Sequence, residues 1–70
     1  MTMIPVELYP HEFVRLTRMR LEMTQAQLAR RLGVARQVVN YYENGIFKIP
    51  DERLEEIRRM VEDAVRKLNP

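Results

Sequence analysis

Four polar residues near the middle of the chain have side chains that can form paired hydrogen bonds with the edges of DNA bases: Arg36, Gln37, Asn40 and Asn44. Arginine offers two parallel donors, and each amide offers both a donor and an acceptor. A helix face selected only for solubility more often carries Glu and Lys, and neither type occurs in residues 36–42. These residue types therefore indicate a surface that binds nucleic acid.

The distribution of charge points to the same segment. The 70 residues carry a formal net charge of only +2, which is too mild to identify a nucleic-acid-binding protein. Residues 24–50, however, have a net charge of +3, because three Arg and one Lys face a single Glu. The net charge is 0 in residues 1–23 and −1 in residues 51–70, so the positive charge is concentrated in the middle third.

Composition excludes several classes of protein. The chain has no Cys and one His, so we expect no disulfide and no metal site. No apolar run approaches the ~20 residues that span a bilayer, and no signal-peptide pattern is present, so we expect a cytoplasmic protein without a membrane partner. Because we find no nucleophile–base pair and no phosphate-binding loop, we expect neither an enzyme nor a cofactor. A chain of 70 residues also leaves no room for a small-molecule effector pocket.

Two short helices joined by a tight turn are predicted to position the polar residues, over residues 24–45. Thr24 is a predicted N-cap, and Gln27 three residues later completes a capping box. The helix over residues 25–32 ends at Gly33, because glycine tolerates the left-handed backbone of a tight turn. Three residues of this helix are spaced to face the core: Leu28, Ala29 and Leu32.

The second helix is predicted to begin at Arg36, or one residue earlier, and to end at Asn44, before Gly45. Val39 and Tyr42 are spaced to face inward. The remaining side chains point outward: Arg36, Gln37, Val38, Asn40, Tyr41 and Asn44. The pair of helices is a helix-turn-helix, whose second helix presents the polar face.

The other segments complete one domain over residues 1–70. Residues 1–9 show no helical pattern and are expected to form an extended arm. A first helix is predicted over residues 10–22, because proline is tolerated in the first turn of a helix. Residues 46–50 are expected to form a loop. The prediction is thus a small all-α fold of four helices, or four to five, with an N-terminal arm.

A long last helix is predicted over residues 51–68, with Asp51 as its N-cap. Its apolar positions alternate three and four residues apart: Leu54, Ile57, Val61, Ala64 or Val65, and Leu68. The stripe beyond Ile57 is longer than a core of three short helices needs. We therefore predict a dimer surface on this helix, formed by Val61, Val65 and Leu68. One alternative is that this stripe folds back onto Phe13 and Leu16 of the same chain. Another is that the dimer forms through the N-terminal arm.

The segment as a whole resembles a known family. Arg18 stands in the first helix, TQAQLA opens the second, LGV forms the turn, and YENG and Pro50 follow. Together these features resemble the Cro/cI-type helix-turn-helix of phage repressors and of the large XRE family of regulators built on it, over about residues 11–57. The resemblance implies a lambda-repressor-like fold and double-stranded DNA as the partner.

The resemblance implies base-reading roles for Arg36 and Gln37, and for Tyr41 one turn later. Tyr41 is also able to contact the sugar-phosphate backbone or simply to pack. From the outward face itself we add Asn40 as a base contact. Val38 belongs either to the rim of the core or to a contact with a thymine methyl group.

Further roles follow from the same resemblance. Gln25 corresponds to a residue that binds a phosphate and braces the recognition helix, and Arg18 and Glu43 to a buried ion pair. Four residues are expected at the DNA backbone: Thr24, Gln25, Asn44 and Lys48. The resemblance also implies that the main chain of residues 45–48 belongs to the loop that contacts phosphates.

The sequence departs from the family pattern in four places. Glu22 stands where Gly or Asn is common, so the turn there is expected to differ. Ala35 replaces the Ser or Thr cap of the recognition helix, which removes a bond worth ~1 kcal/mol. Leu21 is aliphatic where a long polar residue is common. Residues 51–68 form one long helix rather than two short ones.

These observations predict a homodimeric repressor, associated with the nucleoid, that reads a near-palindromic operator in the major groove. Its half-sites would lie about one helical turn (~34 Å) apart. Two alternatives use the same fold: an antitoxin-type autoregulator that also binds a toxin, and a protein-interaction module that binds no DNA.

Overall fold

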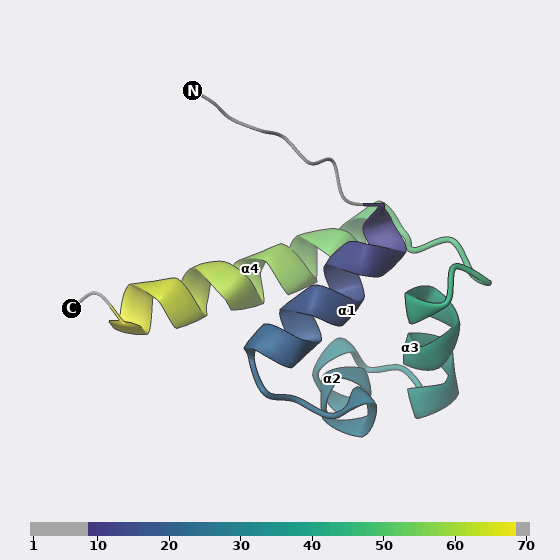
Figure 1. The fold of residues 1–70 in the computed structure, drawn as a ribbon, viewed down its shortest axis with the longest axis horizontal. Helices are drawn as coiled ribbons and strands as arrows, with labels where there is room; N and C mark the ends of the chain where they lie inside the picture. The colour runs from purple at the N-terminus through teal and green to yellow at the C-terminus, as the bar shows by residue number, and fades with distance from the viewer. Residues whose placement is uncertain (1–8, 69–70) are drawn as a thin grey trace.

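The computed structural model describes residues 9–68, and these residues form four helices and no strand (Figure 1). The helices are α1 (Pro10–Arg20), α2 (Gln25–Leu32), α3 (Arg36–Glu43) and α4 (Asp51–Leu68). The predicted all-α fold with a long C-terminal helix is confirmed. Of the predicted arm, residues 1–8 lie outside the described part, and Tyr9 has an extended backbone.

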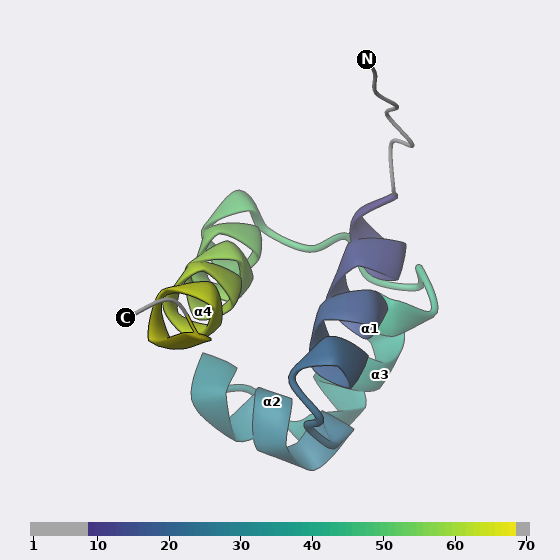
Figure 2. The same ribbon diagram turned by 60° about the vertical axis from the view of Figure 1, so that its left-hand side comes forward.

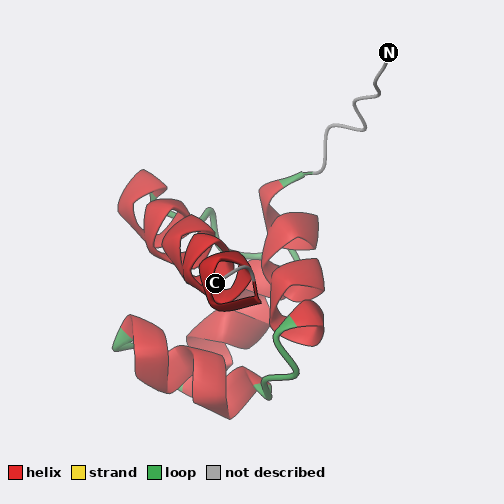
Figure 3. Ribbon diagram, turned by 90° about the vertical axis from the view of Figure 1, so that its left-hand side faces the viewer, coloured by secondary structure: helices red, strands yellow, loops and turns green. Residues whose placement is uncertain are grey.

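Helix α1 lies between α3 on one side and α4 on the other (Figures 1 and 2). Helices α2 and α3 share the most extensive interface, as a helix-turn-helix requires. The loops that connect the helices, drawn in green in Figure 3, comprise residues 21–24, 33–35 and 44–50. All four helices, and the loop before α4, contribute buried apolar residues to one core: Val14, Leu28, Ala29, Leu32, Val39, Tyr42, Ile49, Ile57 and Met60.

Local side-chain and backbone geometry explains where α2 begins and ends. The Thr24 hydroxyl accepts a hydrogen bond from the backbone N–H of Gln27 at 3.0 Å, and the Gln27 side chain accepts one from the backbone N–H of Thr24 at 2.7 Å. This is the predicted capping box. At the other end, Gly33 has a φ of +73°, the left-handed conformation that glycine adopts without steric cost.

Two of the predicted departures from the family pattern have a visible structural effect. Ala35 occupies the N-cap position of α3, and its side chain makes no capping hydrogen bond. Glu22 has a φ of +56°, although it carries a side chain. A residue with a Cβ atom adopts this left-handed conformation at a cost of about 1–2 kcal/mol. The turn between α1 and α2 is therefore strained at Glu22.

Two helix boundaries and one helix cap differ from the prediction. Helix α1 ends at Arg20 rather than Glu22, because the left-handed backbone at Glu22 cannot continue a helix. Helix α3 ends one residue early, so that Asn44 is its C-cap. Asp51 is the first residue of α4 and not its cap, since the carbonyl of the preceding Pro50 already accepts the first helical hydrogen bonds.

The apolar stripe of α4 is also placed differently from the prediction. Ile57 is buried as expected, but Met60, which was not predicted to face inward, is its buried neighbour in the core. Leu68 at the end of the stripe is 79% exposed. None of the helices within residues 9–68 is long and apolar enough to cross a membrane.

Candidate nucleic-acid interface

Helix α3 buries one side and presents the other. Val39 and Tyr42 are buried against α1 and α2, as predicted. Arg36 and Gln37 are exposed, and Asn40 and Tyr41 are half-buried beside them. Because residues three and four apart are neighbours on a helix, these four side chains form one continuous outward face.

Val38 lies at the edge of this face. Its side chain is half-buried and packs against the core. Both interpretations of Val38 therefore stay open, because a side chain at the rim of the core also has an exposed edge.

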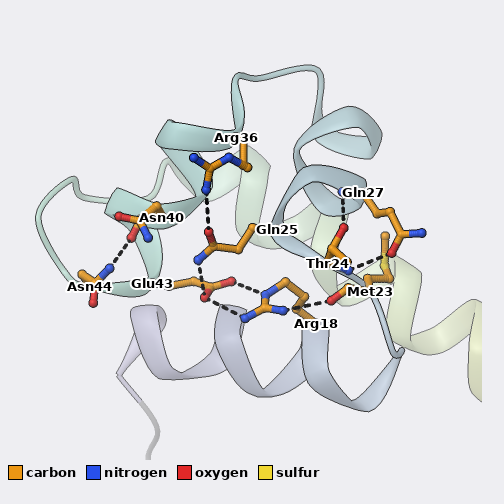
Figure 4. A network of polar contacts seen from close by, with 9 residues as sticks. All are labelled: Arg18, Met23, Thr24, Gln25, Gln27, Arg36, Asn40, Glu43 and Asn44. Atoms are coloured by element: carbon orange, nitrogen blue, oxygen red, sulfur yellow. Dashed lines mark hydrogen bonds and ion pairs between the residues drawn. The ribbon is translucent and has the colours of Figure 1, made fainter.

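An ion pair between Arg18 and Glu43 ties α3 to α1. The Nε atom of Arg18 lies 2.6 Å from Oε2 of Glu43, and its Nη2 atom donates to Oε1 at 3.1 Å (Figure 4). The Glu43 side chain is only 5% exposed. The remaining Nη1 atom of Arg18 donates to the carbonyl of Met23 at 2.9 Å, so the same guanidinium also holds the turn before α2. The pair named from the family resemblance is thus present as a two-pronged contact between the two helices.

Gln25 links this ion pair to the outward face of α3. Its Nε2 atom donates to Oε1 of Glu43 at 3.1 Å, and its Oε1 atom accepts a hydrogen bond from Nη1 of Arg36 at 3.4 Å (Figure 4). A carboxylate can only accept hydrogen bonds, so Gln25 must turn its amide nitrogen to Glu43 and its carbonyl oxygen to Arg36. The family resemblance implied that Gln25 braces the recognition helix, and these two bonds join it to that helix. The particular partner Arg36 was not predicted, because it depends on side-chain directions across two helices.

The polar network leaves a positive surface around α3. The Glu43 carboxylate is neutralised by Arg18, whereas Arg36 and Lys48 are exposed. The first turn of α3 holds no acidic residue. The helix dipole therefore adds partial positive charge at the same end of the helix as Arg36.

The residues expected at a DNA backbone lie at both ends of α3. Thr24 is the N-cap of α2 and Gln25 is its first residue. The side chain of Gln25 reaches both Arg36 at the start of α3 and Glu43 at its end. Asn44 follows the last turn, where its Nδ2 atom donates to the carbonyl of Asn40 at 2.8 Å. Lys48 is exposed in the loop that comes next. Phosphate contacts on both sides of a recognition helix are what insertion into a groove requires.

A family model described as helix-turn-helix matches residues 14–60, which include α2, α3 and most of α1. The chain belongs to the Cro/cI-type helix-turn-helix family. It is accordingly a DNA-binding regulator of transcription. No significant match to the chain is found among curated proteins or among solved structures.

In this Cro/cI-type protein the residues named as a dimer surface border an open groove. Val61 is half-buried, whereas Val65 is 50% exposed and Leu68 more so. They face α1 across a groove of about 850 Å³. The α1 side of the groove is lined by Phe13, Leu16, Thr17, Arg20 and Leu21. The stripe thus lies opposite Phe13 and Leu16, as the fold-back alternative required, but the two sides do not close on one another.

Proposed function

We propose that the protein is a homodimeric repressor that inserts α3 into the major groove of a near-palindromic operator. The observation that carries this proposal is the outward face of α3, with Arg36, Gln37, Asn40 and Tyr41 side by side and backbone-contact candidates at both ends. Such an arrangement separates the two tasks of a DNA reader, since base contacts specify the sequence and phosphate contacts fix the register.

Each side chain of the face suits a particular contact. Arg36 is suited to guanine, whose O6 and N7 atoms accept its two donors. Gln37 and Asn40 are suited to adenine, which presents one donor and one acceptor in the major groove. Val38, at the rim of the core, would offer its exposed edge to a thymine methyl group. Tyr41 extends the same face by one turn.

The register would be set by Thr24 and Gln25 before α3 and by Asn44 and Lys48 after it. Gln25 has a second role in this proposal. Its carbonyl holds Arg36 while its amide nitrogen is held by Glu43, so the first base-reading side chain is oriented before DNA is bound. Less side-chain freedom then has to be lost on binding.

A second copy of this chain is the proposed occupant of the groove between α1 and α4, with Val61, Val65 and Leu68 at its centre. A dimer with a two-fold axis requires a surface that is complementary to itself. Each chain offers an apolar groove and, at the end of α4, an exposed apolar segment that can pack into the groove of the other chain. The groove is lined by residues of α1 and α4, and α3 lies on the other side of α1 (Figure 2). A partner seated there leaves both recognition helices free to reach DNA.

Repression would follow from occupancy of a promoter, in the cytoplasm and on the nucleoid, with no small-molecule effector. Within residues 9–68, no group of three or more His, Cys, Asp or Glu side chains is arranged to hold a metal ion.

Selection from a random duplex DNA pool tests the proposal, with the wild-type protein run beside the Arg36→Ala and Gln37→Ala variants. We expect the wild type to enrich a defined sequence. Each variant should keep its fold and lose preference at one base pair, by about 1–3 kcal/mol. Both side chains are exposed, so circular dichroism should show unchanged helix content.

Two results would contradict the proposal. If both variants keep the wild-type preference, α3 is not the reading element. If the wild type enriches nothing at low or high salt, the protein-interaction alternative replaces DNA reading, and a small protein that co-purifies would favour the antitoxin alternative.

A further inference from the structure

Two exposed apolar residues, Ile46 and Phe47, interrupt the polar surface at the C-terminal end of α3. Ile46 is 62% exposed and Phe47 is 46% exposed. The proposed function uses only Asn44 and Lys48 from this region and leaves this pair without a role. Single exposed apolar residues are common on soluble proteins, so the argument depends on where this pair is held.

The loop that carries the pair is fixed at both ends. The backbone N–H groups of Ile46 and Phe47 both donate to the carbonyl of Tyr41, at 2.9 and 3.4 Å. Two residues further on, Ile49 is buried in the core. The pair is therefore held in the exposed position by the bonded end of α3 and by the buried anchor that follows.

An aromatic contact joins the pair to the outward face of α3. The rings of Phe47 and Tyr41 meet edge to face, with centroids 4.7 Å apart and an interplanar angle of 67°. Such pairs contribute beyond the area that they bury. The apolar pair is thus continuous with a side chain that we place against the bases.

The dimensions of α3 determine what this pair meets when the helix enters DNA. An α-helix with its side chains is about 10–12 Å across, and the major groove of B-DNA is about 12 Å wide. A helix seated in the groove therefore fills its width. A loop that leaves the end of the helix, as residues 44–50 do, then passes along the sugar-phosphate backbone at the edge of the groove.

The charge of the loop favours the same partner. Lys48 lies in the loop and no acidic residue occurs in residues 44–50, while the preceding Glu43 is neutralised by Arg18. The sugar-phosphate backbone presents phosphates, which suit Lys48, and deoxyribose carbons, which suit apolar side chains.

We propose that Ile46 and Phe47 form an apolar contact with the deoxyribose face of the DNA backbone, and that Phe47 also holds Tyr41 in position. This inference rests on the proposed DNA-binding function. It adds a contribution to affinity that does not come from charge, and therefore one that salt does not screen.

Salt dependence separates this contact from a phosphate contact. The probe is a duplex that carries the sequence enriched by the wild type, titrated at several salt concentrations with Ile46→Ser, Lys48→Ala and wild-type protein. Ile46→Ser should weaken binding about tenfold at every salt concentration, with an unchanged slope of log K against log salt. Lys48→Ala should lower the slope by about one per bound protomer.

Met19→Ser is the matched control, because Met19 is also an exposed apolar residue (55%) but lies on α1. The Met19→Ser variant should bind DNA as the wild type does. Phe47→Ser should weaken binding and also relax the preference at the base pair that Tyr41 reads.

If Ile46→Ser and Phe47→Ser both bind as the wild type does, this inference is wrong while the proposed function stands. If Ile46→Ser changes the oligomeric state instead, the pair contacts protein and not DNA. Failure of the wild type itself to bind any duplex would overturn the proposed function.

Discussion

Helix α1 is packed differently on its two sides. Toward α3 it contributes the fully buried Val14 and the two-pronged bond from Arg18 to a nearly inaccessible carboxylate. Toward the last two turns of α4 it leaves an open apolar groove, in which Leu16 is 46% and Val65 is 50% exposed. One side is therefore closely packed, and the other is an open groove.

The difference indicates how the chain divides its tasks. The closely packed side fixes the recognition helix relative to the rest of the domain, so the reading face of α3 exists before any partner arrives. The open side leaves apolar surface that a second copy is proposed to cover. Specificity for DNA and assembly of the dimer would then depend on different residues, and substitutions should affect them separately.

Loss of the ion pair should have the largest effect. Arg18→Ala leaves the Glu43 carboxylate buried without its cation, which should lower the free energy of unfolding by about 3 kcal/mol. Arg58→Ala is the matched control, since Arg58 pairs with Glu55 and Glu62 on an exposed face and is itself 57% exposed. That change should cost no more than about 0.5 kcal/mol. Urea denaturation measures the free energy of unfolding of both variants. Equal losses would show that the ion pair between α1 and α3 stabilises the fold no more than a surface ion pair does.

A charge in the groove should disrupt assembly without unfolding the chain. Val65→Glu would place a carboxylate in an apolar interface, and we expect the dimer to dissociate at least about tenfold more readily. Arg66→Glu is the control, because Arg66 is highly exposed beside Asp63. Sedimentation velocity over a range of concentrations should show monomers for the first variant only. An unchanged dimer of Val65→Glu would place the interface elsewhere.

Helix α2 has a side-chain N-cap and α3 has none, and single substitutions can add a cap to α3 or remove the cap of α2. Ala35→Ser should supply the missing N-cap of α3 and raise the free energy of unfolding by about 1 kcal/mol. Thr24→Ala should remove the existing cap of α2 and lower it by a similar amount. Thermal denaturation of the two variants measures both changes in stability. No gain from Ala35→Ser would mean that the start of α3 is satisfied in another way.

The smallest effect is expected at the turn before α2. Glu22→Gly should relieve the left-handed strain and raise the free energy of unfolding by about 0.5 kcal/mol, after the greater flexibility of glycine in the unfolded chain is subtracted. Glu22→Ala removes the charge but keeps the Cβ atom, and should give no gain. A larger gain from alanine than from glycine would show that the charge, and not the backbone, is unfavourable there.

The helix-turn-helix could be predicted because its signals are local. Thr24 and Gln27 cap each other three residues apart, and Gly33 needs no distant partner to form its turn. Two core residues could not be found in this way. Ile49 lies in a loop without periodicity. Met60 stands three residues after the buried Ile57, whereas the predicted stripe continued to Val61, one position further along the helix.

In the candidate site, too, local features could be predicted, whereas contacts between helices could not. Arg36 and Gln37 were predicted from their types and their place on one helix, and the structure leaves both exposed on α3. The pair of Arg18 and Glu43 came from the family resemblance rather than from spacing. The bond from Arg36 to Gln25 joins side chains of two helices, and only the packed arrangement reveals it.

Selection from a random duplex pool with wild-type and Val65→Glu protein side by side tests the central claim most directly. The claim is that the reading face of α3 is complete in one chain, whereas the groove between α1 and α4 needs a second copy. We predict a two-fold symmetric motif for the wild type, with half-sites about one helical turn (~34 Å) apart, and a single half-site of the same sequence for the variant. A symmetric motif from both proteins, or a variant half-site of different sequence, would contradict the account.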